Sequence, residues 1–251
     1  MICIGIICEG DRDYDLLCAL IEALYPEHEF TFRKIQPDNS LHHEFGNGWK
    51  GVWSWCRENG KDVISIAFGL QPRIDMFIIH MDSDVSRNEK EAHCACGMVE
   101  CENRIKANLP HCPEIKTCKI RLPCAHHEQS AMGRAEHLYG LLHPYFPDEV
   151  TIPIIFTFPS DSTDTWIVAA LDELEEYEEI ANPWNSIVTL KKTYHGVKRQ
   201  DHDKPKKVYE KLIALMLDNK DKIFERCTQA AVFRENISRC IEQIIAFQHE
   251  Q

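Results

Sequence analysis

The sequence predicts an α/β protein with a mainly parallel sheet flanked by helices, and three observations carry that prediction. Apolar runs at residues 2–8, 74–81 and 151–158 are typical of strands that are buried on both faces of a parallel sheet. The first and third runs are each followed by a short polar turn and then by apolar residues at helical spacing. A strand, a turn and a helix in this order form the start of an α/β unit.

The elements of the first half follow from local pattern. After the first strand, Glu9-Gly10-Asp11 reads as a turn, and residues 12–24 carry apolar side chains at the spacing of an amphipathic helix. Phe30-Thr31-Phe32 suits a second strand. Residues 41–58 are interrupted by glycines and end in a helix rich in tryptophan, and the run at 74–81 leads into Asp82-Ser83-Asp84.

The second half is predicted to be less regular. A helix is expected to begin near Thr163, after the strand at 151–158, and the chain divides into a core at 1–170 and a C-terminal part at 171–251. The remaining expectations are a helix at 88–108, an irregular stretch at 109–150, an acidic solvated helical face at 172–179, a loop at 182–206, and amphipathic helices at 206–217 and 221–247.

Composition sets limits on function. The chain has 251 residues, with 40 acidic against 28 basic residues and a formal charge of −12, which argues against a protein that coats DNA through clustered Lys and Arg. No apolar run approaches the roughly 18–20 residues that span a bilayer, so we expect no membrane. The N-terminus has no basic leader, and no export signal accompanies the 12 cysteines of the chain. We therefore expect reduced thiols and a cytoplasmic location.

Acidic side chains follow each of the three apolar runs. Ligand sites in parallel α/β sheets lie beyond the carboxyl ends of the strands, so these acids are expected to converge. Grouped carboxylates repel one another unless a cation lies between them, and Mg²⁺ or Mn²⁺ is the usual partner of oxygen ligands. For any one acid alone, helix capping is the simpler interpretation. The acids and the hydroxyl between them are Glu9, Asp13, Asp82, Asp84, Asp161, Ser162 and Asp164.

In this order, the motifs resemble a known family. Glu9-Gly10-Asp11-Arg12-Asp13 looks like the TOPRIM pattern of a Glu after the first strand with a second acid four residues later, and Asp82-Ser83-Asp84 looks like its DxD motif. Ser162-Thr163-Asp164 is similar to the Ser-x-acid motif of TOPRIM nucleases of the OLD (overcoming lysogenisation defect) type. The resemblance also extends to small stand-alone TOPRIM proteins of bacterial antiviral defence. It covers roughly residues 1–170, and the third acid is Asp where the family usually has Glu.

The resemblance implies a nuclease that depends on Mg²⁺ or Mn²⁺, with catalytic and metal-site roles for the acids. Asp82 and Glu9 would be the innermost ligands, with Glu9 as general acid or base, and Asp13, Asp84 and Asp164 would complete a second ion or its water shell. OLD-type nucleases also use a lysine after the last motif. We take Lys206 as this residue, from the candidates Lys191, Lys192, Lys198, Lys204, Lys206 and Lys207.

A basic segment stands out against the acidic total. Residues 191–207 hold seven basic and two acidic residues, which suits either a phosphate track beside the metal site or a solvated loop. The residues assigned to nucleic-acid binding are Lys191, Lys192, Lys198, Arg199, Lys204 and Lys207.

A second cluster combines cysteine and histidine within residues 93–127. Zinc takes four Cys or His ligands, but this stretch has no paired CxxC spacing, so free thiols are the preferred interpretation and a structural zinc the alternative. The first zinc candidates are Cys112, Cys118, Cys124 and His126, with His127 as a substitute for His126.

These patterns favour a two-metal endonuclease that cleaves phosphodiester bonds of nucleic acid. The resemblance further implies an effector of antiphage defence, held in check by a separate ATPase partner. The alternative is a non-catalytic TOPRIM-like regulatory or scaffold subunit that binds a protein partner. A phosphotransfer or phosphatase domain is a third candidate, but its nucleophilic Asp would stand after the first strand, where this chain has Glu9.

Overall fold

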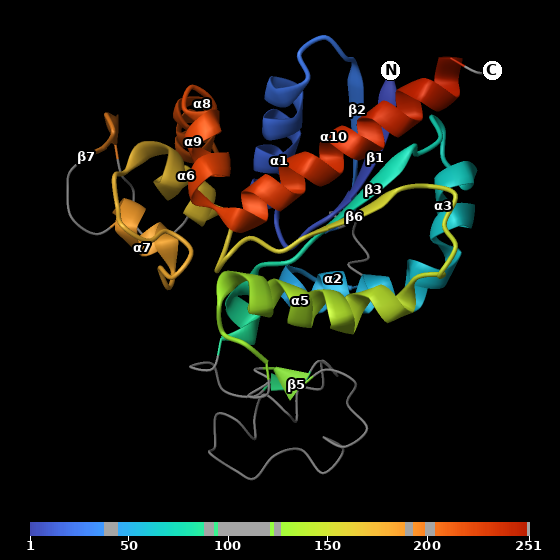
Figure 1. Ribbon diagram of the computed structural model, residues 1–251, viewed down its shortest axis with the longest axis horizontal. Helices are drawn as coiled ribbons and strands as arrows, with labels where there is room; N and C mark the ends of the chain where they lie inside the picture. Colours follow the sequence, from blue (N-terminus) through green and yellow to red (C-terminus); the bar gives the residue numbers. More distant parts are fainter. Residues whose placement is uncertain are drawn as a thin grey trace.

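The centre of the molecule is a four-stranded sheet. The computed structural model describes residues 1–37, 45–87, 93–94, 121–122, 127–188, 193–198 and 204–249. The strands lie in the order β2–β1–β3–β6, and all three neighbouring pairs are parallel. This arrangement confirms the predicted α/β class with a parallel sheet (Figure 1). The strands are β1 (Ile2–Ile7), β2 (Phe30–Gln36), β3 (Met76–His80) and β6 (Ile154–Thr157).

Helices cover both faces of the sheet, and alternate residues of β1 face each layer. Ile4 and Ile6 belong to one buried cluster, and Cys3 and Ile7 belong to the other. The first layer contains α1 (Asp11–Leu24), α6 (Asp164–Leu171), α7 (Pro183–Val188), α8 (Lys206–Leu217), α9 (Lys220–Arg226) and α10 (Thr228–His249). The second contains α2 (Gly48–Asn59), α3 (Val63–Gly69) and α5 (Ala131–Leu142).

Short elements complete the described chain. They are the 3₁₀ turns η1 (Gly60–Asp62), η2 (Ser83–Ser86) and η4 (His143–Tyr145), and two antiparallel pairs, β4 (His93–Cys94) with β5 (Arg121–Leu122) and β7 (Thr193–Tyr194) with β8 (Val197–Lys198).

Two features show how closely the layers pack. A Cβ atom on Gly5 would lie only 2.8 Å from the Phe77 ring, so the glycine lets the ring of β3 lie against β1. Trp166 of α6 is fully buried and its ring lies 5.7 Å from that of Phe233 in α10. The C-terminal helices therefore share the core of the first layer.

The structure corrects several element predictions in the second half. The stretch predicted as irregular at 109–150 contains α5, whose first turn is capped by Ser130 Oγ accepting from the Gly133 amide at 3.1 Å. The predicted loop at 182–206 contains α7 and the β7–β8 pair. The helix expected at 221–247 is two helices that meet at Cys227. Within the helix expected at 88–108, His93 and Cys94 instead form a strand. The other residues of that range lie outside the described residues.

The acidic stretch at 172–179 is also not helical, and Tyr177 explains why. Helix α6 ends at Leu171, and the Tyr177 side chain turns inward to become buried. Its hydroxyl donates to the Asp172 carbonyl at 3.1 Å and accepts from the Leu174 amide at 3.0 Å. These bonds hold the acidic stretch as a compact turn on the surface.

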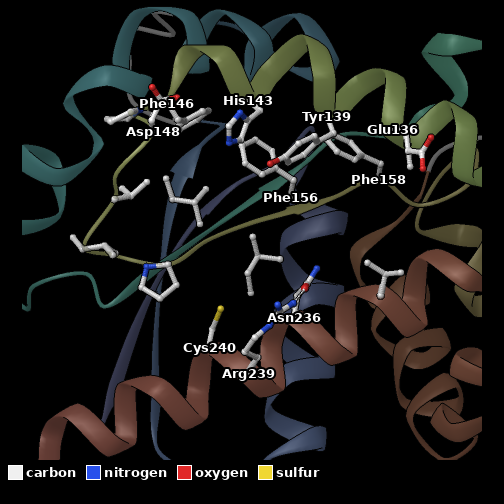
Figure 2. A pocket seen from close by; sticks show the side chains of 18 of the residues that line it. Glu136, Tyr139, His143, Phe146, Asp148, Phe156, Phe158, Asn236, Arg239 and Cys240 are labelled. Atoms are coloured by element: carbon white, nitrogen blue, oxygen red, sulfur yellow. Dashed lines mark hydrogen bonds between the residues drawn. The ribbon is translucent and has the colours of Figure 1, made fainter. Parts of the chain in front are cut away.

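A cavity of about 700 Å³ lies between α5, the edge strand β6 and α10. Tyr139, His143 and Phe156 line one wall, and Asn236 and Arg239 of α10 line the other (Figure 2). Within the described ranges, no helix combines the length and apolar character needed to cross a bilayer.

Candidate metal centre at the carboxyl edge of the sheet

Two acids meet where the central strands end. Glu9 follows β1 and Asp82 follows β3, and these strands are direct neighbours with Ile7 opposite Ile79. The Asp82 amide N–H donates to Glu9 Oε1 at 2.8 Å. The predicted convergence of these two acids is therefore present in the structure, because parallel neighbouring strands end at the same edge.

The second acid of the DxD motif, Asp84, lines a cavity at this edge of the sheet together with Asp82. Asp84 lies in η2, and the cavity, of about 590 Å³, is also lined by Asp164. The same cavity is also lined by residues with nitrogen donors or an aromatic ring, namely Arg87, Lys204, Asn182, Asn185 and Trp184. The lining thus combines acids with cationic and amide groups, and Lys204 directly contacts Asp164.

Burial and nearby negative charge make Glu9 and Asp82 hard to ionise. Burial raises the pKa of Glu9 well above its ordinary value, and the neighbouring Asp82, Asp84 and Asp13 raise it further. Burial and then Asp13 raise the pKa of Asp82 to about 7. A bound cation would remove this repulsion, and a set of carboxylate oxygens is the donor chemistry that Mg²⁺ and Mn²⁺ take. The residues present therefore fit a divalent metal ion.

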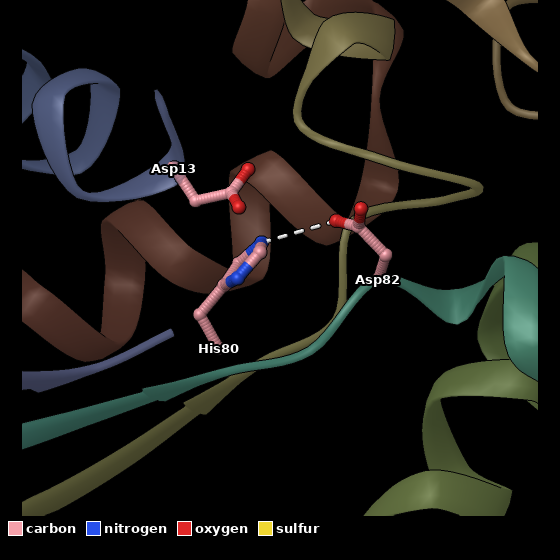
Figure 3. Close-up of side chains that lie close together, drawn as sticks. All are labelled: Asp13, His80 and Asp82. Carbon is pink, nitrogen blue, oxygen red and sulfur yellow. Dashed lines mark ion pairs between the residues drawn. The ribbon is translucent and has the colours of Figure 1, made fainter. Parts of the chain in front are cut away.

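Asp13 reaches the same place from helix α1. It lies in the first turn and is buried, and its Oδ1 accepts from Thr163 Oγ1 at 2.7 Å. Asp13, His80 and Asp82 each offer one ligand atom, and these atoms lie within 4.8 Å of one another (Figure 3). His80 was not among the predicted site residues. It stands two residues before Asp82, and alternation along a strand puts such residues on one side, which is the signal that could have found it.

Asp164 belongs to a different set of contacts. It begins α6 and is only 1% exposed. Oδ2 accepts from Lys204 Nζ at 2.5 Å and from Ser162 Oγ at 3.3 Å, and Oδ1 accepts from the Tyr209 hydroxyl at 3.1 Å. In the structure, Asp164 is thus saturated by side-chain donors, and its direct partner is a lysine.

The lysine in the cavity is Lys204 and not Lys206. Lys206 begins α8, is exposed, and has its Nζ 3.9 Å from Glu210. Burial disfavours the charged form of Lys204, but Asp164, Asp13 and Asp82 together outweigh this, so the pKa of Lys204 is raised and it stays charged. The assignment of the site lysine to Lys206 is therefore corrected to Lys204, since among the candidate lysines that the structure describes only Lys204 contacts an acid of the cluster.

The other predicted residues divide by location. Lys198 and Lys207 are exposed, in β8 and α8 respectively. Several calls lie outside the described residues, namely Lys191, Lys192 and Arg199 of the nucleic-acid set and the zinc candidates Cys112, Cys118, Cys124 and His126.

Asp161 joins the two loops that carry the acids. It adopts a left-handed conformation with φ of 63°, and its Oδ1 accepts from Arg87 Nε at 2.6 Å. Its own amide donates to Ser83 Oγ at 3.1 Å, and its Oδ2 accepts from the Asn182 amide at 2.6 Å. Asp161 is therefore a buried structural partner that fixes the DxD turn against the loop after β6.

These protonation shifts predict a pH effect on stability. The pKa of Glu9 and of Asp82 is raised by burial; that of His80 is lowered by burial but raised overall by Asp13 and Asp82. Near neutral pH the folded state thus binds more protons than the unfolded chain. The free energy of unfolding therefore falls as the pH rises and these protons dissociate. We expect the unfolding temperature of the metal-free protein to fall between pH of about 5 and about 8. Thermal unfolding followed by circular dichroism checks this, and a flat or rising profile would contradict it.

Comparison of the chain with models of protein families, with curated protein sequences and with solved structures finds no match. The evidence on the class of this protein is therefore its fold and the acid cluster around Glu9 and Asp82.

Proposed function

We propose that this protein is a metal-dependent nuclease with a TOPRIM-like core, which cleaves phosphodiester bonds of nucleic acid. The observation that supports this most directly is the contact between Glu9 and Asp82 at the ends of adjacent parallel strands. Asp82 lines a cavity that Asp84 and Lys204 also line. A divalent ion bound by these acids would activate water and offset charge on the phosphate.

The protein groups have distinct roles in this proposal. Burial and three nearby acids raise the pKa of Glu9, which favours its protonated form and suits donation of a proton to the leaving oxygen. Lys204 places a positive charge on the same cavity and stabilises the negative charge that develops on the phosphate. Asp164 and Tyr209 hold this lysine in position, since Asp164 contacts both side chains.

The direct test is a cleavage assay on several nucleic acids. Purified protein is incubated with plasmid DNA, single-stranded DNA, RNA and tRNA in Mg²⁺ or Mn²⁺, with a chelator as the metal-free arm. Cleavage is expected to need the metal and to disappear in Glu9→Gln, which keeps the side-chain shape but removes the charge. Equal cleavage by the wild type and by Glu9→Gln would overturn the proposed site. Metal binding without cleavage of any substrate would favour the scaffold alternative.

Lys204 gives a prediction that separates two neighbouring lysines. Lys204→Met removes the charge that faces the cavity but keeps a long apolar chain against Trp184 and Tyr209, whose rings lie 5.4 and 5.9 Å from Nζ. Loss of one such electrostatic group lowers turnover by about a hundred- to a thousandfold. Lys206→Met, at the exposed neighbour, is the matched control and is expected to cleave like the wild type. A comparable loss in both variants would contradict the assignment of Lys204.

Regulation by a separate ATPase is a further part of the proposal and derives from the family resemblance alone. It predicts that the protein co-purifies with an ATPase from its native host and that the ATPase changes the cleavage rate. Failure of any ATPase to co-purify would remove this part and would leave the metal-dependent cleavage to be judged by its own assay.

A further inference from the structure

His80 is a fully buried histidine that lies beside Asp82 but lacks a hydrogen bond of good geometry. It is the last residue of β3 and is 0% exposed. Within the described residues, neither of its ring nitrogens makes a hydrogen bond of good geometry, and the same is true of Asp82 Oδ1. Buried polar atoms are nearly always hydrogen-bonded, so unpartnered atoms of this kind call for an explanation.

The unpartnered atoms face one another inside the acid cluster. His80 Nε2 lies 3.3 Å from Asp82 Oδ1, and the imidazole lies between Asp13 and Asp82 (Figure 3). Neighbouring ligands of a small divalent ion, each about 2.1 Å from it, lie roughly 3.0–3.5 Å apart. The separation of the two donor atoms thus suits joint binding of one ion, whereas their angles do not suit a hydrogen bond.

The donor set also indicates which ion it would take. Mg²⁺ binds carboxylates, water and phosphate and rarely gives up water for nitrogen. First-row transition ions accept imidazole readily, and a mixed set of one imidazole and two carboxylates matches their preferences. Asp13 is further oriented by the hydroxyl of Thr163, as ligands of metal sites commonly are.

We propose that His80, Asp13 and Asp82 together bind one first-row transition ion, and that the imidazole makes this centre favour Mn²⁺ over Mg²⁺. This inference rests on the proposed metal-dependent function and adds the identity of the ion and a ligand outside the acid motifs. The other explanation for the buried imidazole is a protonated His80 that forms an ion pair with the two acids, and that explanation predicts no metal–nitrogen contact.

The experiment uses Mn²⁺ as the probe on the full-length metal-free protein. Mn²⁺ is titrated and its binding is followed by electron paramagnetic resonance, and the bound ion is examined by pulsed methods that detect coupling to a ligand nitrogen. Nitrogen coupling is expected in the wild type. In His80→Asn this coupling should vanish and Mn²⁺ affinity should fall by at least about tenfold, with a smaller change for Mg²⁺.

A control and a separate readout keep the outcomes distinct. His143→Asn alters a half-buried histidine packed against the rings of Tyr139 and Phe156, and it should keep both coupling and affinity. The wild-type spectrum needs no variant to fold, so Mn²⁺ bound without nitrogen coupling overturns this inference by itself. In that case the nuclease proposal is still tested separately, by the cleavage assay and by whether Asp82→Asn lowers the affinity for Mn²⁺.

Discussion

Protein that carries Asp82→Asn is expected to lose metal-dependent cleavage by about a thousandfold. Asp82 contacts both Glu9 and His80, so it is the acid that connects the other groups of the cluster. A metal ion supplies several kcal/mol of stabilisation to the transition state, and each 1.4 kcal/mol corresponds to about a factor of ten in rate. Removing a central ligand removes most of that contribution.

The same substitution is expected to stabilise the metal-free protein above neutral pH. The pKa of Asp82 is raised to about 7, which means that folding disfavours its charge, and asparagine carries none. The variant should therefore unfold at a higher temperature than the wild type in chelator and at a lower one in excess metal. Asp148→Asn, on an exposed acid, is the matched control and should change neither property. Reduced stability of Asp82→Asn in chelator would contradict this account.

The largest expected effect on stability comes from Arg134. This arginine of α5 is 1% exposed, and its Nη2 donates to Ser160 Oγ at 2.6 Å and to the Glu178 carbonyl at 3.0 Å. It joins the second helical layer to the loop after β6, which precedes Asp164. Arg134→Met fills similar space but removes the charged donor, so that these two acceptors keep only the hydrogen bond from Ser160 Oγ to the Glu178 carbonyl. Hydrogen bonds to a charged group contribute about 1.5–3 kcal/mol each, so we expect a loss of at least that size.

Urea unfolding measures this loss directly. The midpoint for Arg134→Met should fall sharply with an unchanged slope, because the surface exposed on unfolding stays similar. Arg239→Met on α10 is the comparison, since Arg239 pairs with Asn236 of the same helix at the exposed surface and should change stability by no more than about 0.5 kcal/mol. Equal midpoints for the two variants would show that the buried network contributes little.

The central sheet could be predicted because its strands carry a strong signal. Residues of β1 and β3 are buried on both faces, so their sequences are nearly continuous apolar runs with few competing interpretations. Parallel pairing then fixes which ends meet, and the contact between Glu9 and Asp82 follows from strand order alone.

Elements held by tertiary contacts could not be predicted in this way. Helix α5 contains two glycines and a buried arginine, and Gly133 is required because a Cβ atom there would lie 2.4 Å from the Glu128 carbonyl oxygen. Its apolar pattern is consequently weak. The acidic stretch after α6 has helix-forming residues, but the bonds of the Tyr177 hydroxyl hold it as a turn. In both cases a distant partner decides the local conformation.

The site shows the same division between local pattern and distant contact. Strand-end acids were visible in the sequence, whereas the choice of lysine was not, since several lysines follow one another between 191 and 207. Pro205 begins the turn into α8, and Arg12 Nε donates to the Lys204 carbonyl at 3.0 Å. That contact, from a residue 192 positions earlier, fixes the backbone that aims Lys204 at Asp164.

Because Lys204 is joined to α1 and α6 in this way, the order of synthesis has a consequence. Chains grow from the N-terminus, and the acids from Glu9 to Asp164 leave the ribosome well before the lysine that faces them. An unfinished chain can gather its negative charges but lacks the group that balances Asp164. Under the proposed function, the site of the nascent enzyme is therefore incomplete until the segment that carries Lys204 emerges.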